Sequence, residues 1–452
     1  MQLTLLPFTT FATLVLIGLG ASAAPAKRCA LRSASAASAI ASSTASATAS
    51  ASTSSSSSTS GNSSGLVATG WYPGWRASEQ PSSALAWDKY TAMTFAFATT
   101  TADSSTLDLL DEEDTLTTFV SQAKENGVSA ILSVGGWTGS QYFSTNVGSA
   151  ANRTNFMNAI FSLVSEYDLD GIDFDWEYPN GGTTEGIGCN TGSSDDLDNF
   201  LTFLQLLRAN STGASLILTA AVSIKPWNDA SGEPSTNVSA FADVLDHIAI
   251  MAYDIYGKWS STVGPNAPLN DSCATTSEQV GSDISAVAAW TAAGFPVDQI
   301  VLGIPGYGHS FYVNESDAFT SSGTLALYPT FDAALQPMGD SADDTSSSIT
   351  EKDICGNVEG ITGVFNFWGM VDGGFLSEDG SPATGIDYVY DNCSQTPFVY
   401  NSTSHVMISY DNAESFKAKG DYIKSAGLAG FALWDTVSDY NNILLDAITS
   451  VV

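Results

Sequence analysis

The sequence predicts an α/β protein in which eight parallel strands close into a barrel with helices on the outside. Two observations carry this prediction. Short apolar or β-branched runs recur from residue 66 onward, and segments with helical periodicity separate them, which is typical of βα units around a parallel sheet. Eight such runs are present, and eight is the number of strands that a closed barrel of this kind needs.

The predicted strands are residues 66–72, 92–98, 129–135, 171–177, 215–222, 247–254, 300–305 and 428–434. Amphipathic segments at 114–126, 151–167, 195–209, 277–293 and 413–426 are expected to be helices that cover the barrel. The interval between the last two strands is much longer than the others. Because residues 311–407 are rich in Gly, Pro and aromatic residues, we interpret them as a small α+β subdomain inserted between strands 7 and 8.

The first 65 residues are expected to precede the barrel, which is predicted over 66–452. Residues 11–19 are an apolar stretch too short to span a bilayer, and small residues follow at 21–23, so 1–23 are predicted to be a secretory signal peptide. The dibasic pair at 27–28 is either a propeptide processing site or two solvated charges. Between residues 33 and 60 every residue except Ile40 is Ser, Ala or Thr, so 24–65 are predicted to include a disordered, O-glycosylated stalk.

The charge balance argues against several classes of partner. The chain of 452 residues has 48 Asp plus Glu and 14 Lys plus Arg, which gives a net charge of −34. A phosphate backbone or an anionic membrane surface would be repelled by such a protein, so we expect neither nucleic acid nor membrane as a partner. The 44 % of hydrophobic residues is enough for a large packed core, and we expect a monomer.

Five cysteines agree with an oxidising compartment, and together with the signal peptide they predict a secreted protein with disulfide bonds. Cys29 lies beside the stalk, and the other four can form two bridges in three ways. We favour Cys189 with Cys273 and Cys355 with Cys393. A zinc site is not expected, since no cysteine pair has ligand spacing and the three histidines are scattered. Glycosylation sequons lie at Asn62, Asn152, Asn210, Asn237, Asn270, Asn314, Asn392 and Asn401.

The fourth predicted strand has an unusual acidic pattern, DGIDFDWEYP at 170–179. Because side chains alternate along a strand, Asp173, Asp175 and Glu177 point to one side, and Phe174 and Trp176 point to the other. The aromatic pair would face the helices and the carboxylates the barrel interior. Successive carboxylates would lie about 6–7 Å apart at their Cα atoms, so we expect a shared proton and at least one raised pKa. A calcium site is the alternative reading.

The segment DGIDFDWE resembles the DxxDxDxE signature of the family 18 glycoside hydrolases, the chitinases. Further segments resemble the same family in the same order: SVGGW at 133–137, MAYD at 251–254, GWYPGW at 70–75 and LAGFALWDT at 428–436. The resemblance covers residues 66–452. It implies a (β/α)8 TIM barrel that hydrolyses the β-1,4 linkages of N-acetylglucosamine polymers with retention, using the substrate as nucleophile and needing no metal or organic cofactor.

The resemblance also implies roles for individual residues. Glu177 would be the general acid and later the base, and Asp175 would orient the acetamido group of the sugar in subsite −1. Asp173 would hold or share the proton of Asp175, and Tyr253 would donate a hydrogen bond to the acetamido oxygen. The substrate-binding residues implied are Trp434 as the floor of subsite −1, Asp254 and Met251 beside it, and Trp137 on the leaving-group side. Gly136, which fits a close backbone turn, is a further candidate, and Tyr72 and Phe95 either line the cleft or belong to the core.

One departure and two other functions stay open. The family commonly has an arginine where this chain has His309, which either alters a sugar or carboxylate contact or is bonded within the insertion interface. A chitin-binding lectin of the same fold arises when the acid is replaced, and Glu177 is present. An endo-β-N-acetylglucosaminidase acting on N-glycans is the third reading, and the insertion favours a linear chitin chain over it.

Overall fold

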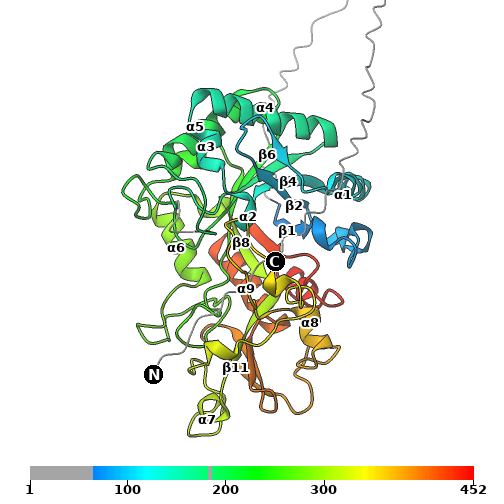
Figure 1. Ribbon diagram of the computed structural model, residues 1–452, viewed down its shortest axis with the longest axis vertical. Coiled ribbons are helices and arrows are strands. Elements are labelled where there is room, and N and C mark those ends of the chain that lie inside the picture. The colour runs from blue at the N-terminus through cyan, green and yellow to red at the C-terminus, as the bar shows by residue number, and fades with distance from the viewer. Residues whose placement is uncertain (1–64, 182–185) are drawn as a thin grey trace, which may run out of the picture. The chain divides into compact units, whose positions relative to one another are not determined.

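A computed structural model describes residues 65–181 and 186–452 (Figure 1). The predicted signal peptide, the stalk and Cys29 lie outside these residues. Eight parallel strands form the predicted barrel, which closes because β1 pairs with both β14 and β2. In spatial order these strands are β1 (Val67–Pro73), β14 (Gly430–Trp434), β8 (Ile300–Pro305), β7 (His247–Ile250), β6 (Ile217–Val222), β5 (Gly171–Asp175), β4 (Ser129–Gly135) and β2 (Ala92–Thr100). A short β3 (Leu107–Asp108) adds to β2.

Five long helices occupy the positions predicted for them. They are α1 (Glu113–Glu125), α4 (Ala150–Tyr167), α5 (Asp196–Ala209), α6 (Asp283–Ala292) and α9 (Ala413–Ala426). Local signals explain their ends. Asn412 and Ser415 form a capping box at the start of α9, and Gly427 ends that helix with a φ of 73°. Short helices complete the set at α2 (Gly136–Gly139), α3 (Phe143–Val147) and α10 (Ile443–Thr449).

The insertion after β8 is an antiparallel sheet with two short helices, yellow to orange in Figure 1. Its strand order is β10 (Val364–Asn366), β9 (Tyr307–Tyr312), β13 (Val406–Ser409), β12 (Thr396–Asn401) and β11 (Asp387–Asp391), with helices α7 (Glu315–Ala318) and α8 (Phe367–Asp372). The sheet begins four residues before the predicted insertion of 311–407 and ends two residues after it. The predicted class and position of the insertion are therefore confirmed, and its bounds are slightly wider.

Several predicted elements are shorter in the structure, and three of them border the polar loops. Strand β5 ends at Asp175 and β7 ends at Ile250, so Glu177 and the segment 251–254 follow their strands instead of lying on them. Helix α6 begins at Asp283, because Ser282 and Ser285 form a capping box there and Gly281 before them has a φ of 152°. These ends place the polar residues in the loops at the carboxyl ends of the strands.

The favoured disulfide pairing is wrong. The structure joins Cys189 to Cys355 and Cys273 to Cys393, with Cα–Cα distances of 5.6 and 6.2 Å. Both bridges connect the insertion to loops of the barrel, whereas the predicted pairs would have joined neighbours in the sequence. Spacing along the chain carries no information on how the loops meet in space, which is why the three connectivities could not be separated.

The core has an outer and an inner part. The predicted outward residues of β5, Phe174 and Trp176, pack against aromatic rings of the helical layer, with Phe143 stacked on Trp176 at 5.1 Å. Inside the barrel, small side chains surround Trp71: Ala96, Ala221, Ala249, Val301 and Ala432. These small residues leave space for polar groups at the centre of the barrel. No helix in the described part of the chain is long and apolar enough to cross a membrane.

Candidate active site

Asp173 lies at the centre of the barrel and is almost completely buried, with 2 % of its surface exposed. It accepts hydrogen bonds from Trp71 Nε1 at 3.0 Å, Ser133 Oγ at 2.8 Å and Thr219 Oγ1 at 2.7 Å. Burial raises the pKa of its carboxyl, and these three donors oppose the rise. The donors come from β4 and β6, which pair with β5, and from β1, which does not, so Asp173 also links β5 to a strand elsewhere in the barrel.

Asp175 is the last residue of β5, and its environment favours the protonated form. Burial, followed by repulsion from Glu177 and Asp173, raises the pKa of this carboxyl well above its ordinary value. Its Oδ1 is buried and has no hydrogen-bond partner among the described residues. The backbone of Gly135 comes so close that a Cβ there would lie 2.1 Å from the Asp175 carbonyl oxygen, and its φ of 114° also suits glycine.

Glu177 follows the strand by two residues, and the surrounding loops hold its backbone. Ser140 Oγ accepts from its N–H at 3.0 Å, and Asn190 Nδ2 donates to its carbonyl oxygen at 2.7 Å. Burial raises the pKa of the Glu177 carboxyl to about 7; the hydrogen bond from Tyr178 opposes this rise and the charge of Asp254 adds to it. A carboxyl group with such a pKa can donate a proton near neutral pH.

The raised pKa values predicted for the acidic row are therefore present. Asp175 and Glu177 both line a cavity of about 450 Å³ at the mouth of the barrel, while Trp176 between them is buried. This cavity overlaps a larger one of about 890 Å³ that continues toward the insertion. Predicted site residues that line both are Glu177, Trp137, Met251, Tyr253, Asp254 and Trp434.

Aromatic rings form much of the wall around Trp434. Its ring lies 5.8 Å from the ring of Phe97 and 6.5 Å from that of Trp75. Trp75 and Trp137 are each 52 % exposed, and Trp259, which lines the larger cavity, is 58 % exposed. Exposure of large aromatic rings in a cavity is typical of a binding site. The sequence pattern did not mark Trp75, Phe97 or Trp259 as site residues, although GWYPGW contains the first of them.

Three residues proposed to bind substrate, Tyr72, Phe95 and Gly136, line neither cavity. Tyr72 and Phe95 are fully buried and pack against Phe119 of α1, with ring distances of 5.6 and 5.5 Å. The hydroxyl of Tyr72 donates to the Gln80 carbonyl. Gly136 is buried at the start of α2, where a Cβ would lie 2.9 Å from the Phe97 ring. These residues therefore support the wall of the cavity without facing it.

Tyr253 and Asp254 lie in the loop after β7. Burial, followed by the charges of the surrounding carboxylates, raises the pKa of Tyr253 well above its ordinary value, so its hydroxyl keeps its proton. No hydrogen bond from another described residue reaches that hydroxyl. Asp254 Oδ1 lies 2.7 Å from both the Tyr307 hydroxyl and His309 Nε2. His309 therefore lies in the wall of the larger cavity and contacts a predicted site residue from the insertion sheet.

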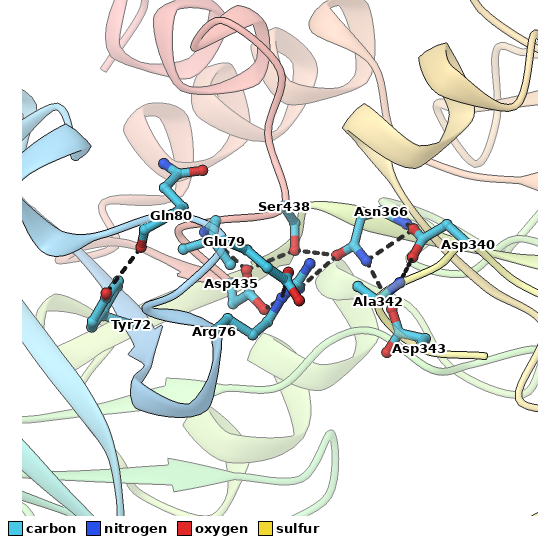
Figure 2. Close-up of polar contacts among 11 residues, drawn as sticks. Tyr72, Arg76, Glu79, Gln80, Asp340, Ala342, Asp343, Asn366, Asp435 and Ser438 are labelled. Carbon is cyan, nitrogen blue, oxygen red and sulfur yellow. Dashed lines mark hydrogen bonds and ion pairs between the residues drawn. The ribbon is translucent and has the colours of Figure 1, made fainter. Parts of the chain in front are cut away.

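A buried polar network around Arg76 joins the segments that follow β1 and β14 to the insertion (Figure 2). The Arg76 side chain is 9 % exposed, and its Nη1 donates to Asn366 Oδ1 at 3.2 Å and to Asp435 Oδ2 at 3.4 Å. Ser438 Oγ lies within hydrogen-bond distance of the same two side chains, 2.6 Å from Asn366 Oδ1 and 2.7 Å from Asp435 Oδ1. Asn366 and Asp435 line the larger cavity, so this network forms part of its wall.

The same network contains a second group of acidic residues. Asn366 Nδ2 donates to Asp340 Oδ2 at 2.9 Å and to Asp343 Oδ2 at 2.8 Å (Figure 2). Burial, followed by repulsion from Asp340, raises the pKa of Asp343 to about 7, which Arg76 opposes. Arg76 is the cation that balances Asp435 in this group. Among residues 65–181 and 186–452, no three His, Cys, Asp or Glu side chains are arranged to hold a metal ion.

Comparisons with known proteins agree with this geometry. The profile described as Glycosyl hydrolases family 18 matches residues 67–439. A chitinase-like effector of Moniliophthora roreri is 50 % identical over 384 residues, covering 84 % of this chain and 92 % of that protein. Chitinase A1 of Niallia circulans is 30 % identical over 324 residues, which cover 70 % and 41 % of the two chains. The crystal structure of a chitinase from Rhizomucor miehei has a TM-score of 0.76 and 35 % identity, covering 85 % of this chain and 99 % of that one.

Proposed function

The chain belongs to family 18 of the glycosyl hydrolases, and from this premise we propose that it is a secreted chitinase. It hydrolyses the β-1,4 linkages between N-acetylglucosamine units of chitin and chitooligosaccharides, with retention. The observation that carries the proposal is the pair formed by Asp175 and Glu177 in one cavity, where the pKa of Glu177 is raised to about 7. Two disulfide bonds support export, since such bonds persist in oxidising compartments.

In the proposed reaction the substrate supplies its own nucleophile. Glu177 gives its proton to the glycosidic oxygen while the acetamido oxygen of the sugar in subsite −1 attacks the anomeric carbon. This step breaks the glycosidic bond and forms an oxazolinium ion, and the leaving sugar departs with the proton. Glu177, now a carboxylate, takes a proton from water while the water oxygen bonds to the anomeric carbon. The bond between that carbon and the acetamido oxygen breaks, which opens the oxazolinium ring and restores the acetamido group with net retention.

Three side chains assist the acetamido group in this proposal. Asp175 accepts a hydrogen bond from its N–H with the buried Oδ1 that has no other partner among the described residues. Tyr253 donates a hydrogen bond from its hydroxyl to the acetamido oxygen, where negative charge is concentrated before the attack. Asp173, held by its three donors, holds or shares the proton of Asp175. Trp434 provides the apolar surface under the sugar.

The first test is turnover by the wild-type protein. We expect soluble chitooligosaccharides to appear from colloidal chitin and shorter products from chitohexaose, measured by mass spectrometry. Binding to chitin is measured in parallel by co-sedimentation. Products would support a chitinase, whereas binding without products would support the second function below. Neither binding nor products would overturn both.

A second candidate is binding of chitooligosaccharides without cleavage. It is favoured by one observation, that the relative with 50 % identity is named a chitinase-like effector and not a chitinase. The exposed rings of Trp75, Trp137 and Trp259 would serve a binding protein as well as an enzyme. The retained Glu177 and the cavity around it favour the enzyme, since binding alone does not need an acid there.

The pH profile gives a further prediction. The acid must be protonated to act, so kcat/KM for an aryl chitobioside is expected to fall as the pH rises through about 7, where the Glu177 carboxyl loses its proton. Above this point the decline is about tenfold per pH unit. Because Asp175 and Glu177 interact, the apparent pKa read from this decline describes the titration of the pair and not of Glu177 alone. A decline that began near the ordinary pKa of a glutamic acid would contradict the assignment of Glu177.

A further inference from the structure

Two segments that are far apart in the sequence are joined by a disulfide bond beside the cavity. Residues 186–190 lie between β5 and α5, and residues 351–361 lie in the insertion between β9 and β10. The bond between Cys189 and Cys355 links them across 166 positions of the chain. We call these two segments together the strap.

The barrel side of the strap contacts the backbone of Glu177. Asn190, next to Cys189, donates from Nδ2 to the Glu177 carbonyl at 2.7 Å. Gly186 packs so closely that a Cβ there would lie 2.2 Å from the same carbonyl oxygen. Thr191 is anchored in turn, since its N–H donates to the Gln141 carbonyl at 2.8 Å. This part of the strap is therefore held directly against the loop that carries the acid.

The insertion side of the strap is held by the loop after β7. Lys258 Nζ donates to the Ile361 carbonyl at 2.8 Å, and Lys258 precedes the exposed Trp259. Within the segment, Lys352 and Val358 form an antiparallel bridge. Asp353 Oδ1 accepts the backbone N–H of Cys355 at 2.9 Å, which shapes the turn that carries the cysteine. The segment is thus a hairpin with fixed ends.

Both sides of the strap line the larger cavity and neither lines the smaller one. Ile187, Asp353, Val358 and Glu359 belong to the wall of the 890 Å³ cavity, together with Tyr178 and Trp259. Glu177 and Trp434 line both cavities, whereas Asp175, which the proposed function places against the acetamido group of subsite −1, lines only the smaller one. The strap therefore borders the space beyond Glu177, into which a leaving sugar chain would extend.

We propose that the disulfide-linked strap forms a wall of the subsites for the leaving-group side of the substrate and determines the affinity for longer chains. Val358 and Ile187 offer apolar surface to sugar rings, and Asp353 and Glu359 offer carboxylates to hydroxyl groups. Because the bridge holds both segments in place, little entropy is lost when a chain binds. This inference rests on the proposed function for the position of the cleaved bond.

The test compares the Cys189→Ser/Cys355→Ser variant with a Cys273→Ser/Cys393→Ser control. The control bridge also joins the insertion to the barrel, and no residue within two positions of its cysteines lines the cavity. We expect removal of the strap bridge to raise KM for chitohexaose about tenfold with little change in kcat. An aryl chitobioside has a small leaving group, so its kcat/KM is expected to stay unchanged, and the control is expected to leave both substrates unaffected.

Several results would overturn the proposal. An equal loss of kcat/KM on both substrates would show that the bridge acts through Glu177 alone, and no loss on either would show that the strap binds nothing.

Should the double serine variant not fold, Val358→Ser leaves the disulfide bond in place and is expected to raise KM for chitohexaose alone. If the wild type cleaves neither substrate, the proposed function fails. The strap is then tested by tryptophan fluorescence, where loss of the bridge must weaken chitohexaose binding more than chitobiose binding.

Discussion

Glu177→Gln is expected to lower kcat/KM for chitohexaose by about 10²- to 10⁴-fold, the usual contribution of a general acid. Glutamine has nearly the same shape and keeps the hydrogen-bonding capacity of the side chain, but it cannot transfer a proton to the glycosidic oxygen. The backbone contacts of this residue with Ser140 and Asn190 do not involve its carboxyl and are expected to persist. Initial rates of product release, measured by chromatography, give the ratio.

Binding separates loss of chemistry from loss of structure in this variant. The dissociation constant for chitohexaose is expected to stay within a few fold of the wild type, because the aromatic wall of the cavity is intact. Glu166→Gln, an exposed substitution on the outer helix α4, is the matched control and should keep full activity. Equal turnover by Glu177→Gln and the wild type would refute the proposed mechanism.

Arg76→Met is expected to reduce the free energy of unfolding by about 3–5 kcal/mol. Methionine retains much of the apolar stem but removes the charge that balances Asp435, a carboxylate whose side chain is 8 % exposed. Asn366 Oδ1 also loses the hydrogen bond that it accepts from Arg76 Nη1 at 3.2 Å (Figure 2). A buried carboxylate without its cation keeps its large desolvation cost. Removing one partner of such a pair therefore lowers the free energy of unfolding by more than the intact pair contributes to it.

An exposed ion pair provides the comparison. Lys89 and Asp446 are 2.7 Å apart, with side chains that are 27 % and 59 % exposed, so Lys89→Met should cost only about 0–1 kcal/mol. Urea unfolding followed by circular dichroism at neutral pH measures both variants. A loss for Arg76→Met no greater than that for Lys89→Met would show that the network adds nothing specific to stability.

The acidic row shows how far local pattern reasoning reaches. The alternation of side chains on a strand predicted that Phe174 and Trp176 face the helices and that the carboxylates face the interior, and both predictions are confirmed. The raised pKa values followed from burial and like charge alone. What the pattern did not contain is the set of three donors on Asp173, since they come from three other strands.

The aromatic residues show where the same reasoning fails. Phe95 and Phe97 are two positions apart and should point to the same side, yet Phe95 is buried against α1 and Phe97 lines the cavity. The register of β2 against β4 shifts between Phe95 and Ala98, and such a bulge reverses the side to which the following residues point. Tyr72 lies opposite Phe95 in the parallel register and faces the same outer layer. Nothing in the local sequence marks this bulge.

Properties that depend on neighbours along the chain are determined by the amino-acid sequence alone. They are the eight βα units, the place of the insertion and the side of β5 that carries the acids, because hydrophobic periodicity is a local property. Properties that depend on residues meeting across the fold are decided only by the tertiary structure. Three such properties are the cysteine pairing, the Arg76 network and the fact that Phe97, not Phe95, lines the cavity. Each depends on contacts between distant segments, which form only when the barrel closes and the insertion packs against it.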